Sequence, residues 1–271
     1  MRPENRAVRF RRVVPVVLAG CLLAGCSDDA TPGKYQPPEA VQFSYRWTAT
    51  AGVDLTSDAA IVTRAVIESS FIAAITGTTS ERDIGKYTYP GYTRAVDRAV
   101  ADKDPSPYKV WDSSILGTAP PLHGTTYLYL AALNPSANAT APRTVDALTC
   151  VWFNGLSKDV SPPEKYASLR NPALTPQAVK LKLRAPQEDT PKLTALGHGL
   201  SRYPVSDVFG DWSVESIEIT NRDLKGRAYQ DPCVDLPGNP VPPEQLAVTG
   251  LTFYRDPLPT LDPSPGWPAA Q

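Results

Sequence analysis

The second half of the chain alternates short β-rich runs with long, proline-rich connections, and this pattern constrains the fold more than any other feature. In residues 179–184 apolar side chains alternate with lysine and arginine, a period of two that predicts a strand with one solvent-facing side. Further β-rich runs lie at residues 125–133, 145–153, 213–220 and 247–254. The connections at 154–177, 185–211 and 221–246 are rich in proline, which interrupts regular structure. We therefore expect antiparallel strands joined by proline-rich loops.

The first half of the chain predicts one more strand and a long helix. Residues 43–49 alternate aromatic with polar side chains, which predicts a strand with one aromatic face. Ser57 and Asp58 can cap a helix that runs to about Thr76, and Gly77 is placed to end it.

The long predicted helix carries its apolar residues along one stripe, which indicates that one side packs on a core. Arg64 and Glu68 are spaced to support a helix through an i, i+4 pair. A shorter helix is predicted at residues 93–101. Helices early and strands later predict an α+β domain, with N-terminal helices packed on a curved antiparallel sheet of five or six strands.

The N-terminus is built differently from the rest of the chain. Residues 1–26 hold five arginines and one acidic residue, and residues 13–25 form an apolar run of 13 residues. A helix needs about 20 apolar residues to span a bilayer, so this run is too short. A basic leader, a short apolar run and small residues at its end predict a secretory signal.

The apolar run ends in Leu-Ala-Gly-Cys at residues 23–26, with an earlier copy at residues 18–21. Both segments resemble the lipobox of bacterial lipoproteins, in which small residues admit the signal peptidase and the cysteine thiol receives a diacylglycerol. The resemblance implies export, cleavage before Cys26 and acylation of Cys26, with palmitate among the acyl chains. We favour Cys26 over Cys21 because cleavage there leaves an apolar segment of normal length behind Arg12. The richness in Arg, Ala and Pro is also similar to that of actinobacterial proteins.

The resemblance, together with the composition and patterns of the remaining residues, predicts the organisation of the whole chain. The expected parts are a signal peptide (1–25), the lipidated cysteine and a flexible tether (26–41), a single globular domain (42–255) and a proline-rich tail (256–271). Each buried methylene of a lipid chain contributes about 0.8 kcal/mol, so two or three chains give stable anchoring. The expected location is the extracytoplasmic face of the cell membrane.

Two cysteines remain after the lipobox is set aside, Cys150 and Cys233. Outside the cytoplasm a thiol pair tends to oxidise, which predicts a structural disulfide between them. A metal site would need further ligands, and the spacing of the two histidines offers none, so no metal or other cofactor is expected.

The tail holds five prolines within residues 256–271. It is predicted to be an extended strap or a disordered end, and the alternative is a polyproline II ligand for a partner.

The segment Tyr-Pro-Gly-Tyr at residues 89–92 precedes the shorter predicted helix. It faintly resembles nuclear-transport-factor-2-like proteins, in which a helix pair precedes a cone-shaped sheet. The predicted strand at residues 43–49 departs from that order, and no function is inferred from this likeness.

Familiar catalytic motifs are absent from the sequence. It has no Gly-x-Ser-x-Gly elbow, and the glycine-rich segment at residues 197–202 lacks the third glycine of a dinucleotide loop, so it is interpreted as a turn. His198, between two glycines, and His123, ahead of a strand, are candidate general bases, although both are simpler to interpret as loop histidines. Glu215 and Glu218 fall on opposite faces of a strand and cannot act as a pair.

Tyr127 and Tyr129 share one face of a predicted strand. If this face lines a cavity, the two side chains are candidate ligand-binding residues, because tyrosine combines an apolar ring with a polar tip. The alternative is that both belong to the core.

The charge of the chain excludes one class of function. The whole chain carries a net charge of −1, but residues 26–271 carry −5, which disfavours binding to the phosphates of a nucleic acid. The sequence predicts a lipid-anchored, non-enzymatic binding or interaction module for a small or lipid-like ligand or another envelope protein. The alternatives are an extracytoplasmic hydrolase or isomerase with an unrecognised site, and a structural or phage-exclusion envelope protein.

Overall fold

A computed structural model describes residues 35–77, 81–96, 111, 121–136, 143–161, 165–169, 176–186, 192–220, 232–233, 236, 238–246 and 251–269. All of them belong to one compact unit, Lys34–Gln271. The predicted signal segment, both lipobox cysteines and the start of the tether lie outside the described residues. Among those that the structure describes, no helix has the length and apolar character needed to cross a membrane.

The described elements confirm the α+β class, but strands dominate. In chain order they are β1 (Val41–Ala49), α1 (Asp58–Ile75), α2 (Glu81–Tyr87), α3 (Tyr92–Ala95), β2 (Leu122–Pro135), β3 (Thr144–Trp152), β4 (Leu156–Asp159), β5 (Tyr166–Ser168), β6 (Gln177–Arg184), a 3₁₀ turn (Thr194–Leu196), β7 (Ser213–Thr220), α6 (Pro243–Leu246) and β8 (Phe253–Tyr254).

The strands form one open sheet of eight, where the sequence predicted five or six. Their order is β7-β6-β3-β2-β4-β5-β8, and β1 pairs with the other edge of β2. The pair β1 and β2 is parallel, unlike the expected all-antiparallel sheet, because α1 crosses over between the two strands. The other pairs among the described strands are antiparallel.

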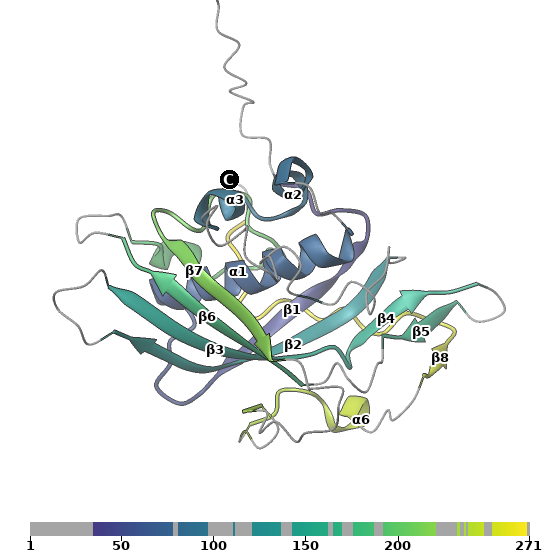
Figure 1. Ribbon diagram of the computed structural model, residues 1–271. Helices are drawn as coiled ribbons and strands as arrows, with labels where there is room; N and C mark the ends of the chain where they lie inside the picture. The colour runs from purple at the N-terminus through teal and green to yellow at the C-terminus, as the bar shows by residue number, and fades with distance from the viewer. Residues whose placement is uncertain are drawn as a thin grey trace, which may run out of the picture. The chain divides into compact units, whose positions relative to one another are not determined.

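A kink in the chain explains the extra strands. β3 and β4 lie one after the other along the same edge of β2, and residues 153–155 separate them. At this point Gly124 has a φ of +114°, and a Cβ on it would collide with the carbonyl of Gly155. The two glycines therefore let the backbones approach closely where the chain bends. Beyond the kink the sheet continues as two arms, β3-β6-β7 and β4-β5-β8 (Figure 1).

Helix α1 lies across one face of the sheet, with α2 and α3 beyond it, while α6 lies on the other side (Figure 1). The prediction of one apolar stripe was wrong, because sixteen of the eighteen residues of α1 are buried. A helix that is enclosed on all sides is part of the core rather than a cover for it. The predicted helix at 93–101 is only the short α3 as far as Ala95, and residues 97–101 lie outside the described part.

The sheet has an apolar cluster on each face. The larger one, on the α1 side, includes Phe43, Phe71 and Phe153. The smaller one, on the opposite face, gathers Tyr127, Tyr129, Trp152 and their neighbours. Successive side chains of β2 and β3 point to opposite faces of the sheet, so they belong alternately to these two clusters.

Candidate functional site

The predicted disulfide is present. Cys150 on β3 is joined to Cys233, 83 residues later, with 5.6 Å between the two Cα atoms. The bond ties the chain just before α6 to the middle of the sheet. In the chain-entropy model, closing a loop of this length contributes about 4 kcal/mol.

The two predicted ligand-binding tyrosines lie beneath this disulfide. Tyr127 and Tyr129 share a face of β2, as expected, and pack with Trp152, Val241 and Cys233. The hydroxyl of Tyr129 lies 2.9 Å from Oγ1 of Thr50. Tyr127 is only 3% exposed, and burial raises the pKa of its hydroxyl. The structure therefore places both rings in a packed cluster.

The glycines on either side of His198 lie in close contact with other parts of the domain. The carbonyl of Gly197 accepts a 2.8 Å hydrogen bond from Nη1 of Arg64. A Cβ on Gly199 would collide with the carbonyl of Trp267. These contacts explain the glycines without a phosphate, in line with the turn interpretation, and they leave His198 on the exposed surface.

Residues 251–269, here called the strap, begin with β8, cross the neighbouring strands on the face opposite α1, and then reach the free edge of β1, where Ser264 exchanges backbone hydrogen bonds with Tyr45 and Trp47. Each of four strands presents one buried hydroxyl to the backbone of the strap, and the four residues are Ser44, Thr125, Ser157 and Ser168. For example, Oγ of Ser157 accepts the amide of Leu258 at 3.0 Å. Between β8 and Ser264 the strap runs across the strands, so side-chain hydroxyls bond its backbone there in place of ladder hydrogen bonds.

The strap ends in a buried cluster around Glu68 of α1. Oε1 of Glu68 accepts a hydrogen bond from the indole of Trp47 (2.7 Å), and Oε2 accepts from the hydroxyl of Tyr89 (2.6 Å) and the indole of Trp267 (3.0 Å). Burial raises the pKa of Glu68, whereas the charge of Arg64 and the three donors lower it. Glu68 is 1% exposed, so this cluster holds the fold together and is closed to a ligand.

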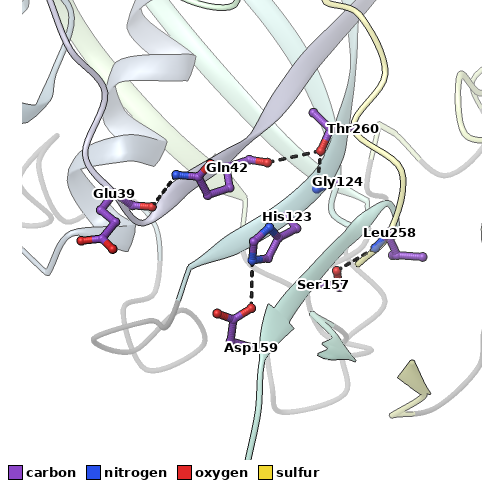
Figure 2. Close-up of polar contacts among 8 residues, drawn as sticks. All are labelled: Glu39, Gln42, His123, Gly124, Ser157, Asp159, Leu258 and Thr260. Carbon is purple, nitrogen blue, oxygen red and sulfur yellow. Dashed lines mark hydrogen bonds and ion pairs between the residues drawn. The ribbon is translucent and has the colours of Figure 1, made fainter. Parts of the chain in front are cut away.

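A partly exposed cluster lies beside the strap, at the end of the β4 arm. Nε2 of His123 on β2 is 2.8 Å from Oδ1 of Asp159 on β4 (Figure 2). The ring of Tyr166 on β5 stands edge-on to the imidazole, with 5.3 Å between centroids. The side chains of His123 and Asp159 are 21% and 43% exposed, which makes this pair accessible to solvent.

Strand register explains why these residues meet. His123 lies opposite Gln42 of β1, Asp159 lies opposite Tyr166, and Tyr166 lies opposite Tyr254 of β8. Residues that face one another on paired strands project from the same side of a sheet. Gln42, His123, Asp159, Tyr166 and Tyr254, here called the rim cluster, therefore share one face.

Of the rim cluster, sequence reasoning singled out only His123. Its partners come from four strands, and their proximity depends on a register that no local pattern reveals. Ser157, opposite His123, is a poor nucleophile candidate because it is buried and already accepts the amide of Leu258. Within the described ranges, no three His, Cys, Asp or Glu side chains are grouped to hold a metal ion. The rim cluster thus offers an oriented imidazole, a carboxylate, an amide and two phenol rings.

No protein-family model matches the chain, and no curated protein or solved structure is significantly similar to it.

Proposed function

We propose that this protein is a lipoprotein of the bacterial cell envelope, a non-enzymatic binding module held on the extracytoplasmic face of the cell membrane through acylated Cys26. The Cys150–Cys233 disulfide carries the proposal, because such bonds persist outside the reducing cytoplasm. It agrees with the export leader and the lipobox, which point to the same compartment.

The distance between anchor and domain supports a function at the membrane surface. The described domain begins at Tyr35, whose hydroxyl donates to the carbonyl of Tyr87 at 2.8 Å. Tyr35 follows Cys26 by nine residues. Even a fully extended chain covers only about 3.3–3.6 Å per residue, so Tyr35 stays within about 30 Å of the acylated cysteine.

Packing favours a surface interaction over an enclosed ligand. Tyr127 and Tyr129 are covered by the disulfide-linked segment, and Glu68 is closed off by three aromatic side chains. The rim cluster keeps exposed polar and aromatic groups together. A partner of the domain therefore has an accessible surface at the rim cluster rather than a cavity inside the sheet.

The anchor is tested in a bacterial host that processes lipoproteins. Cys26→Ala in the full chain should stop acylation and either release the protein from the membrane fraction or stall its processing, as intact-mass spectrometry would show. Cys21→Ala is the matched control and should be acylated normally. Unchanged processing and membrane association of Cys26→Ala would refute the assignment.

A second candidate function is an extracytoplasmic hydrolase or isomerase with His123 as general base. The 2.8 Å contact between His123 and Asp159 favours it, because a carboxylate that orients an imidazole is a common element of such sites. This candidate requires an activity that disappears in both His123→Gln and Asp159→Asn and survives in His198→Gln.

A further inference from the structure

We propose that the rim cluster is a binding site for a neutral saccharide. The inference deepens the proposed function and rests on it for location, because an extracytoplasmic module meets the glycans of the cell envelope. The chemistry of the five side chains supports it independently of the anchor.

Two tyrosines supply the apolar part of the site. Tyr166 and Tyr254 lie directly opposite one another on β5 and β8, and both are partly exposed. A phenol ring presents a flat apolar face together with a polar hydroxyl. The C–H face of a pyranose ring packs on such a surface, while its hydroxyls reach the polar groups around it.

Planar polar side chains supply the hydrogen bonds. The exposed amide of Gln42 and the carboxylate of Asp159 lie on either side of His123 across neighbouring strands. Amides and imidazoles both donate and accept, and a carboxylate accepts, so together they match the paired hydroxyls of a sugar. A few convergent polar groups beside an apolar surface are typical of sites for small ligands.

The site is held in place before a ligand arrives. The strap forms one side of it, because Oγ1 of Thr260 accepts the amide of Gly124 (3.2 Å) and donates to the carbonyl of Gln42 (3.3 Å) (Figure 2). Asp159 is oriented by His123, and Nε2 of Gln42 donates to the carbonyl of Glu39 at 3.0 Å. Fixed groups lower the entropy lost on binding.

The charge at the rim cluster favours a neutral sugar over an acidic one. Asp159 brings a negative charge to the site. Lys158 lies opposite Leu122, a core residue, so the alternation of β4 directs it away from the rim cluster. Phosphorylated or carboxylated sugars are therefore disfavoured at this surface.

Binding is measured with the full chain in lauryldimethylamine N-oxide, a detergent without a sugar headgroup. The neutral probes are maltohexaose, mannohexaose, xylohexaose and chitohexaose, and the acidic probe is hexagalacturonate. We expect saturation-transfer NMR to show contact with the C–H groups of at least one neutral probe and no contact with hexagalacturonate. Calorimetry then gives the affinity for that probe.

Variants locate the site. Tyr166→Ala and Tyr254→Ala should each weaken binding about tenfold or more, because each removes a stacking surface. Phe253→Ala is the matched control, since Phe253 neighbours Tyr254 on the same strand, is 51% exposed and projects from the other face. Its affinity should equal that of the unaltered chain. Tyr166→Phe keeps the ring, so its affinity should stay within about threefold of that of the unaltered chain. This variant tests the position even if Tyr166→Ala does not fold.

Three results overturn the proposal: no neutral probe contacts the folded protein at millimolar concentration, Phe253→Ala loses as much affinity as Tyr254→Ala, or hexagalacturonate binds more tightly than every neutral probe. Cys26→Ala separates this inference from the anchor. The unlipidated chain should bind the same sugar equally well, so a failure of the lipoprotein assignment leaves the saccharide test intact.

Discussion

The indole of Trp267 donates a 3.0 Å hydrogen bond to Oε2 of Glu68, although 199 positions separate the two residues in the chain. The guanidinium of Arg64 lies 4.4 Å from the centre of the same indole ring, and its Nη2 donates to the carbonyl of Pro265 at 2.8 Å. A cation over the face of a tryptophan is favourable, and more so when both are desolvated. The strap is therefore anchored in the core of the domain.

Replacing Trp267 should destabilise the whole domain. Trp267→Ala should lower the free energy of unfolding by about 3–5 kcal/mol, as expected for a buried aromatic side chain. Trp267→Phe keeps a ring but leaves Glu68 one donor short, and should cost about 1–3 kcal/mol. Urea denaturation measures both. Leu261→Ala, at an exposed position of the strap, is the control, and equal losses in all three variants would contradict the anchoring role.

Removing the carboxylate of Glu68 should be equally damaging. Glu68→Leu leaves three aromatic donors without their acceptor and removes the negative charge that offsets the buried Arg64, so we expect a loss of about 3–5 kcal/mol. The control is Glu215→Leu, which breaks a partly exposed ion pair with Arg184 and should cost less than about 1 kcal/mol. Thermal unfolding compares them, and a Glu68→Leu protein as stable as Glu215→Leu would disprove the structural role.

The tyrosines near Glu68 should make the fold sensitive to high pH. Burial first, and the charge of Glu68 second, raise the pKa of Tyr45 and Tyr89 well above the ordinary value, and burial also raises the pKa of Tyr203. Above about pH 10 the unfolded chain loses these protons while the native state keeps them. The native state then binds more protons, so the free energy of unfolding falls as pH rises beyond that point.

This dependence is measurable by tyrosinate absorbance and by the melting temperature at increasing pH. Absorbance should lag behind that of the urea-unfolded chain until the protein unfolds. Tyr45→Phe should reduce the loss of stability per pH step. Ionisation of all twelve tyrosines near pH 10 in a protein that is still folded would rule out the buried cluster.

The disulfide should be required for full stability and should leave no free thiol at its two positions. A Cys150→Ala, Cys233→Ala double variant should lose about 2–5 kcal/mol, and dithiothreitol should have a similar effect on the unaltered chain. Alkylation of the denatured, unreduced protein followed by mass spectrometry checks the pairing. Modification of both cysteines without reduction is the result that would overturn it.

Local features of the fold were predictable from the sequence. The long helix begins at Asp58 and ends at Ile75, close to the predicted limits. Ser57 takes the N-cap position, although its side chain makes no capping hydrogen bond, and Gly77, with a φ of +64°, follows the C-terminal end. β7 occupies residues 213–220, as its β-rich run indicated. β4 and β5 were missed because they are short and follow a kink. Only two residues of the predicted strand at 247–254 form β8, and residues 247–250 lie outside the described part.

Whether the residues of a predicted element are buried or exposed depends on residues far away in the chain. Arg64 and Glu68 have the spacing of a surface pair, yet both are buried, because Trp47, Tyr89 and Trp267 come from three other segments. The same holds at the rim cluster. His123 could be named from its residue type, but its contact with Asp159 follows from the pairing of β2 with β4.

The order in which the chain emerges gives the strap a further consequence. In a protein exported through a membrane channel from the N-terminus, as we propose, β1 and α1 reach the outside long before Trp267 does. Until then Oε2 of Glu68 lacks one of its two donors, and contacts between residues so distant in sequence form slowly. If the chain is exported in this order, the last buried donor of Glu68 arrives only when Trp267 has emerged, so the core is completed late.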